Sequence, residues 1–93
     1  MKIKQNKWAL INLLGKTGSL SLLESLNLPK RYSELKHLTA SDKTLAERLK
    51  ELEENKLIET VSLKSGTRFF VHYQITSAGK KVLEKLNQFA VVK

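Results

Sequence analysis

The apolar residues of this chain change their spacing near residue 57, and this change limits the folds that the chain can adopt. Before it they recur at every third or fourth position, which is typical of one face of a helix. Over 57–75 they alternate with polar residues, as in a half-buried strand, and after 76 the helical spacing returns. The sequence therefore predicts helices, then one β-hairpin, then a last helix.

The predicted hairpin has two strand segments, LIETVSL at 57–63 and RFFVHYQI at 68–75, joined by the turn KSGT. Gly66 in this turn can adopt the positive φ that tight turns require. The alternation of the second segment places on one face Phe69, Val71, Tyr73 and Ile75. The opposite face then holds Phe70, His72 and Gln74.

Helical segments surround this hairpin. An apolar cluster at 8–14 ends near Gly15–Gly18, and a second segment, capped by Ser19, stops before Pro29; the alternative is one helix with a kink at the glycines. A short helix within RYSELKHL is expected to be capped by Ser33. The last helix follows the segment TSAG, which we expect to cap it.

The longest helix before the hairpin is expected to start after its cap, Ser41, and to end at about Asn55–Lys56. At 100° per residue, one buried stripe contains Leu45, Leu49, Leu52 and Lys56. Other side chains of the first turns, Lys43, Thr44 and Glu47, point away from it, and Arg48 lies on its flank. The expectation for Glu51, Glu53 and Glu54 is that they face solvent.

A short helix, the turn TAS and a longer helix indicate a helix-turn-helix, and the hairpin after it indicates the winged form. Three segments occur in order along this part of the chain: RYSEL, LAERLKELEENKLIE and VHYQITSAGKKVL, the last of which contains the pattern Tyr-x-Ile-Thr-x-x-Gly. Through these segments, over about residues 30–85, the chain resembles winged-helix transcriptional regulators of the HxlR type and, less closely, those of the MarR and ArsR groups. Residues 1–28 differ from the pattern expected for the first helix of that type.

The resemblance implies an α+β winged helix-turn-helix, with a three-helix core, a hairpin wing and additional N- and C-terminal helices. The second helix of such proteins contacts base edges from its N-terminal end. For the recognition helix, about 42–55, the candidate base contacts are Ser41, Lys43, Thr44 and Glu47. Phosphate contacts are expected from Arg31 and Arg48. On the wing, at 64–68, candidates for the minor groove or backbone are Lys64, Ser65, Thr67 and Arg68. The alternative for both sets is an ordinary solvated surface.

The net charge of +8 indicates an anionic partner. The charge is uneven, because residues 31–56 are neutral while the segments before and after carry the excess. We therefore expect double-stranded DNA as the partner, with two alternatives. The high total charge would also suit a non-specific architectural DNA binder, and the neutral middle would suit a winged helix that contacts another protein.

The ends of the chain suggest how it assembles. A single domain over 1–93 has more apolar residues than the winged-helix core needs. We expect the helices of 1–28 and 77–93 to form a homodimer interface through Trp8, Ile11, Leu14, Leu83, Leu86 and Phe89. The alternative is that these helices pack on each other within one monomer.

Other functions find little support in the sequence. Without cysteine there is no disulfide, thiolate metal site or thiol sensor, and His37 and His72 lack metal-ligand spacing. The segment GKTGS matches part of a phosphate-binding loop but lacks the glycine and strand before it. No apolar run reaches the roughly 18 residues of a transmembrane helix, and the N-terminus lacks a signal-peptide cleavage site. We therefore expect a cytoplasmic protein that is not an enzyme, with no metal, cofactor or membrane partner; an effector ligand stays unknown.

Overall fold

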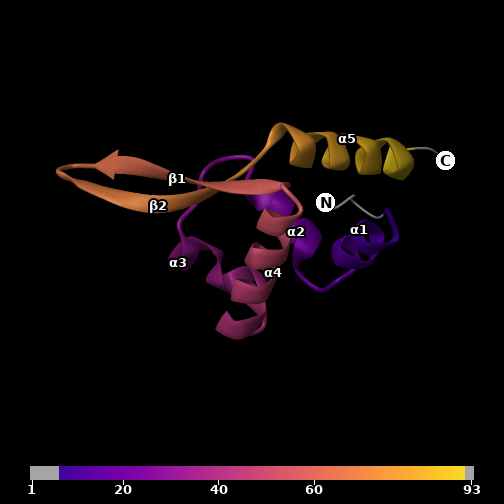
Figure 1. Cartoon of the computed structure of the whole chain (residues 1–93), viewed down its shortest axis with the longest axis horizontal. Helices are drawn as coiled ribbons and strands as arrows, with labels where there is room; N and C mark the ends of the chain where they lie inside the picture. The colour runs from indigo at the N-terminus through magenta and orange to yellow at the C-terminus, as the bar shows by residue number, and fades with distance from the viewer. Residues whose placement is uncertain (1–6, 92–93) are drawn as a thin grey trace, which may run out of the picture.

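The computed structural model describes residues 7–91, in which helices surround the base of one long β-hairpin. In chain order the elements are α1 (Lys7–Leu14), α2 (Ser19–Ser25), α3 (Tyr32–Leu35), the 3₁₀ turn η1 (Lys36–Leu38), α4 (Asp42–Glu54), β1 (Ile58–Ser65), β2 (Arg68–Ile75) and α5 (Ser77–Val91). The hairpin projects from one side of the molecule, and α1 and α5 lie on the opposite side (Figure 1). This arrangement confirms the predicted α+β winged helix-turn-helix.

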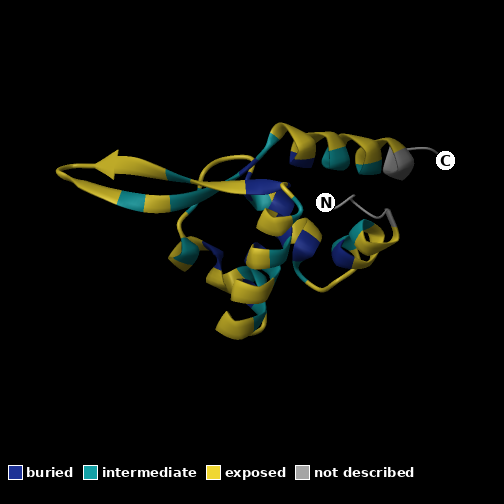
Figure 2. Cartoon of the chain, in the orientation of Figure 1, coloured by how far each residue is buried: buried dark blue, intermediate teal, exposed yellow. Residues whose placement is uncertain are grey.

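The core is built mainly from leucine side chains of α2, α3, α4 and the start of β1. Its buried members are Leu13, Leu22, Leu23, Leu26, Leu35, Leu45, Leu49, Leu52, Leu57, Ile58 and Ile75. Burying each such side chain contributes about 1.5–3 kcal/mol to folding. Because α2 supplies the buried Leu22 and Leu23, and its C-cap Leu26 is buried as well, it belongs to the core rather than to an end helix with a free face. Figure 2 shows this buried centre with exposed elements around it.

Helix α2 begins differently from the prediction. Its N-cap is Gly18, which has a left-handed φ of 89°, and not Ser19. Ser19 is the first helical residue, is fully buried, and its hydroxyl has no hydrogen-bond partner. The glycine fits because a positive φ is costly for residues that carry a Cβ.

Helix α3 is capped by Arg31, so the prediction that Ser33 caps it is wrong. The Glu34 carboxylate reaches back and accepts a hydrogen bond from the Arg31 amide at 2.8 Å. This contact satisfies one of the free amides at the helix start, and Ser33 lies one residue inside the helix. The predicted cap of α4 is confirmed, because the Ser41 hydroxyl accepts from the Thr44 amide at 3.1 Å.

The end of α4 is a Schellman motif with an unusual residue in it. The Lys56 amide donates to the Glu53 carbonyl at 2.9 Å, and the Leu57 amide donates to the Leu52 carbonyl at 3.0 Å. Lys56 has a φ of 64°, where glycine is the usual residue. The prediction that Lys56 belongs to the buried stripe is therefore wrong, since it lies beyond the helix and is exposed.

The hairpin is antiparallel and pairs Ile58 with Ile75 at its base and Ser65 with Arg68 at its tip. Strand β1 extends two residues further than predicted, so that Gly66, with a φ of 67°, and Thr67 form the turn. Lys30 pairs with Tyr73 through two backbone hydrogen bonds, which attach the base to the segment before α3. From Tyr73 toward the tip of the hairpin, the strands leave the core and are largely exposed (Figure 2).

The junction from β2 to α5 explains the pattern Tyr-x-Ile-Thr-x-x-Gly. The Thr76 hydroxyl donates to the Lys56 carbonyl at 2.7 Å and accepts from the Gly79 amide at 3.1 Å, so it caps α5. A Cβ on Gly79 would overlap the Leu57 carbonyl oxygen. The threonine and glycine of the pattern thus allow the backbone of α5 to lie close to Lys56 and Leu57, at the start of the hairpin.

Candidate nucleic-acid interface

The N-terminal end of α4 presents two long charged side chains to solvent, Lys43 and Glu47. Their exposure agrees with the helical-wheel prediction. The hydroxyls of Ser41 and Thr44 are hydrogen-bonded to each other at 3.1 Å, and Thr44 is half-buried. Of the four predicted base contacts, Lys43 and Glu47 therefore extend furthest from the helix, while Ser41 and Thr44 mainly stabilise its first turn.

The start of α4 is held against the preceding helix by contacts at Asp42. The Tyr32 hydroxyl donates to the Asp42 carbonyl at 3.0 Å, and Lys36 and Asp42 form an exposed ion pair at 3.7 Å. In the connection, the Thr39 hydroxyl donates to the Ser41 carbonyl at 3.0 Å. These contacts fix the angle at which α4 leaves the turn. A fixed angle sets the direction of the first turns of α4, which carry Lys43 and Glu47.

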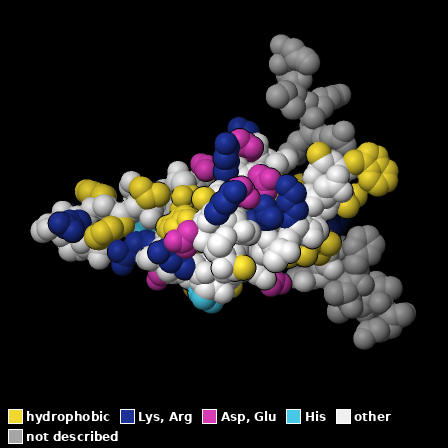
Figure 3. All heavy atoms as spheres, turned by 90° about the horizontal axis from the view of Figure 1, so that it is seen from below, with side chains coloured by type: hydrophobic (Ala, Val, Ile, Leu, Met, Phe, Trp, Pro, Cys, Tyr) yellow, Lys and Arg dark blue, Asp and Glu magenta, His cyan; other side chains and the backbone are white. Residues whose placement is uncertain are grey.

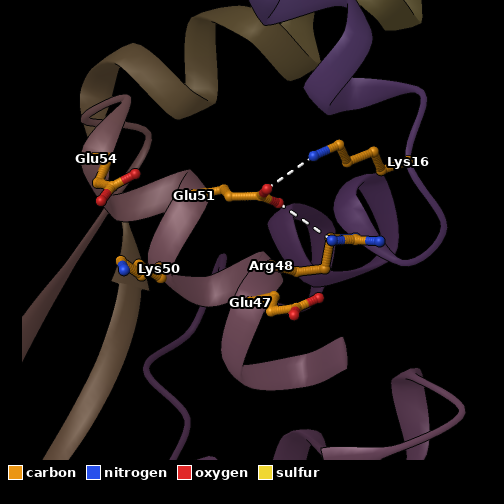
Figure 4. A pocket seen from close by; sticks show the side chains of 6 residues that line it. All are labelled: Lys16, Glu47, Arg48, Lys50, Glu51 and Glu54. Carbon is orange, nitrogen blue, oxygen red and sulfur yellow. Dashed lines mark hydrogen bonds and ion pairs between the residues drawn. The ribbon is translucent and has the colours of Figure 1, made fainter. Parts of the chain in front are cut away.

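Further along α4, Arg48 and Glu51 bind the loop between α1 and α2. Arg48 donates from Nε to the Thr17 carbonyl at 3.0 Å and from its guanidinium to Glu51 at 3.2 Å. Glu51 also accepts from the Lys16 ammonium at 2.7 Å. The three side chains converge in Figure 4, at one wall of an open, polar pocket whose remaining lining residues are Glu47, Lys50 and Glu54.

These contacts correct the expectation that Glu51 faces solvent. The hydrogen bond from Lys16, with the charges of Lys16 and Arg48, holds the pKa of Glu51 below its usual value of 4.5 although partial burial acts in the opposite direction. Sequence reasoning missed Lys16 and Thr17, because nothing in the local pattern relates them to a helix more than 30 residues away. Arg48 has partners within the chain, so its contact with phosphate stays a prediction.

The tip of the hairpin is basic and exposed. The four wing residues predicted to contact DNA, Lys64, Ser65, Thr67 and Arg68, are all exposed. Seen from below, Lys and Arg side chains lie at the projecting end of the molecule with apolar side chains next to them (Figure 3). Arg31, the remaining predicted phosphate contact, is exposed and lies with its guanidinium carbon 4.5 Å from the centre of the Phe70 ring.

The residues predicted for the dimer interface divide into two groups. Trp8 and Ile11 of α1 are 67% and 55% exposed. Leu14 and Leu83 are partly buried against the core of their own chain, and Leu86 is half-buried. The side chain of Phe89 lies outside the described residues. The interface hypothesis therefore depends most on the exposed face of α1.

In the described part of the chain, most of the predicted DNA contacts lie in two groups, one at the start of α4 and one at the hairpin tip, while Arg31 and Arg48 lie outside both. Within that part, no three His, Asp or Glu side chains gather as a metal-binding group. No helix among residues 7–91 is long and apolar enough to span a membrane. The site thus offers charged and polar groups for surface recognition.

Comparison with known proteins connects this geometry to a family. A family model described as HxlR-like helix-turn-helix matches residues 6–92. The match includes the N-terminal segment, which our sequence interpretation treated as a departure from that type. No curated protein matches the chain.

Solved structures support the same assignment. The reduced form of the transcriptional regulator YodB from B. subtilis is similar at 32% identity and a TM-score of 0.72, over 96% of this chain and 92% of that one. A putative transcriptional regulator of the MarR family from Porphyromonas gingivalis W83 is similar at 26% identity and a TM-score of 0.71, over 97% and 93% of the two chains. A possible HxlR family transcriptional factor from Thermoplasma volcanium GSS1 shares the fold, with a TM-score of 0.67 at 21% identity over 97% and 83%.

Proposed function

The chain belongs to the HxlR-like helix-turn-helix family, and from this premise we propose that it is a transcriptional regulator that binds specific sequences in double-stranded DNA. In this proposal the N-terminal end of α4 enters the major groove. The hairpin tip lies on the minor groove or the backbone beside it. No enzymatic step is part of this function.

The observation that carries the proposal is the exposed pair Lys43 and Glu47 on the capped first turns of α4. Lysine can donate to guanine N7 and O6, and glutamate can accept from the amino group of cytosine. The contacts that hold Asp42 fix the direction of the first turn of α4, from which these side chains extend. A fixed direction favours the recognition of particular bases over general attraction to phosphate.

We also propose that the regulator is a homodimer. The exposed Trp8 and Ile11 of α1 support an apolar interface on the side opposite the hairpin (Figure 1). A two-fold dimer would place two copies of α4 in successive major grooves and would require a palindromic site. Sedimentation of the wild type and of Ile11→Glu tests this, with Leu28→Glu, an exposed leucine in the loop after α2, as the control. A wild type that sediments as a monomer at all concentrations would exclude the dimer.

The experiment that tests the function is selection from a random-sequence duplex pool at two salt concentrations, followed by sequencing of the bound fraction. Enrichment of a palindrome supports a dimeric, sequence-specific regulator. An absence of binding even at low salt contradicts the DNA-binding role and favours a winged helix that contacts another protein, for which the neutral charge of residues 31–56 is the supporting observation.

A second candidate is a non-specific architectural DNA binder, which the net charge of +8 favours. In the same selection it would retain DNA in a salt-dependent way without enriching any sequence. Either DNA-binding role fits the cytoplasmic location expected from the sequence.

A further inference from the structure

Two adjacent phenylalanines on β2 have opposite environments. Phe70 is half-buried beneath the Arg31 guanidinium, whereas Phe69 is 67% exposed. Successive side chains of a strand point to opposite faces, so Phe69 lies on the face that Arg31 does not cover. Together with the exposed Val71 on the same face, the Phe69 ring forms an apolar surface at the projecting end of the hairpin that the fold does not bury.

The neighbours of Phe69 show what kind of partner it suits. Its cross-strand partner is Lys64, which lies on the same face, and Arg68 precedes it at the tip. Val71, two positions on, continues the apolar face and is 57% exposed. Between Thr60 and Ile75 the hairpin has no carboxylate. The face thus combines apolar and positively charged groups and lacks negative charge.

The sugar-phosphate backbone of DNA has the complementary chemistry. Each deoxyribose presents apolar C–H groups, and the phosphates on either side of it are negative. We propose that the Phe69 ring packs on deoxyribose at the edge of the minor groove, while Lys64 and Arg68 contact the flanking phosphates. This contact rests on the proposed DNA-binding function and adds Phe69 to the wing residues that perform it.

A protein partner would need a different surface. Interfaces between proteins are depleted of lysine at their centre, whereas Lys64 lies directly opposite Phe69. The surface near the tip is also one strand pair wide, which suits a groove edge more than a broad interface. The face therefore favours the nucleic acid backbone.

Salt titration separates an apolar contact from an ionic one. Using the full chain and a duplex obtained by selection with the wild type, we expect Phe69→Ala to weaken binding about tenfold while the slope of log K against log salt stays the same. Lys64→Ala should instead reduce the magnitude of that slope by about 0.9, the amount that corresponds to one phosphate contact. Leu63→Ala is the matched control, an exposed apolar residue on the opposite face of the hairpin, and should change binding by less than about threefold.

Hydroxyl-radical footprinting locates the contact, because the radical attacks deoxyribose from the minor groove. The wild type should protect sugars beside each recognition half-site, and Phe69→Ala should lose that protection while keeping the rest of the footprint. Wild-type affinity and an unchanged footprint for Phe69→Ala would overturn the inference and point to a protein partner for this face. Failure of the wild type to bind any duplex would overturn the proposed function itself, which is a separate result.

Discussion

The Lys16 ammonium lies 2.7 Å from the Glu51 carboxylate, so the loop after α1 is joined to α4 by an ion pair between distant parts of the chain. Arg48 strengthens the connection by binding both the Thr17 carbonyl and Glu51. Because α1 also carries the exposed residues of the proposed dimer interface, these contacts set the position of α4 relative to that interface. This connection gives the first prediction.

Replacing Glu51 with glutamine should destabilise the protein by about 1 kcal/mol near neutral pH, since a partly exposed ion pair of this kind is modest. The folded-state pKa of Glu51 is lowered, so its contribution is fully present above the usual value of 4.5 and is lost as the pH falls through the folded-state pKa. Urea unfolding of both proteins from about pH 7 to about pH 3 measures this. The stability difference should shrink with acidification. A difference that is constant over the range would contradict the assignment.

Replacing Lys43 with alanine should relax base preference at one position of each half-site, with a loss of about 1–3 kcal/mol of discrimination there. Lys43 is exposed on the first turn of α4, and its removal does not disturb the core. Repeating the duplex selection with this variant provides the measurement. The control is Lys50→Ala, an exposed lysine nearer the other end of α4, which should leave the selected sequence unchanged. Identical selected sequences for Lys43→Ala and wild type would remove Lys43 from the base contacts.

Replacing Gly79 with alanine should destabilise the fold by about 1–3 kcal/mol or more, because the new methyl group would overlap the Leu57 carbonyl and the Ile75 side chain. Thermal unfolding followed by circular dichroism measures the change. Gly15→Ala is the matched control, because its methyl group would meet only backbone oxygens at 3.5 Å and 3.7 Å. Equal melting temperatures for the two variants would show that α5 can shift away from the hairpin without cost.

Replacing Lys56 with glycine should stabilise the protein by up to about 1 kcal/mol, because the residue has a φ of 64° and its side chain is exposed. The same substitution at Lys50, inside α4, should destabilise by about 1 kcal/mol. The two changes remove the same charge, so opposite signs in chemical unfolding isolate the backbone effect. If Lys56→Gly also destabilises, the side chain contributes a contact that outweighs the strain.

The elements of the fold could be predicted from the sequence because apolar spacing reports directly on local structure. The hairpin, the cap at Ser41 and the buried face of α4 with Leu45, Leu49 and Leu52 are all confirmed. The errors at helix starts have a local cause. Several serines can act as caps, and the chain instead uses Gly18, and Arg31 with the help of Glu34.

The candidate site was less predictable where distant segments meet. A helical wheel shows that Lys43 and Glu47 avoid the core, and both are exposed. The wheel carries no information about the loop that packs beside α4, so it could not show that Glu51 binds Lys16. Likewise the alternation of β2 assigned Phe69 to the same face as Tyr73 but could not show that the strand leaves the core between them.

The projecting half of the hairpin lies apart from the leucine core. Its contacts with the rest of the molecule lie at the base, where Lys30 and Tyr73 pair, and at Phe70, which Arg31 covers, while residues 64–69 at the tip are exposed. Under the proposed function, changes at the exposed tip would therefore alter DNA contacts while the leucine core stays intact.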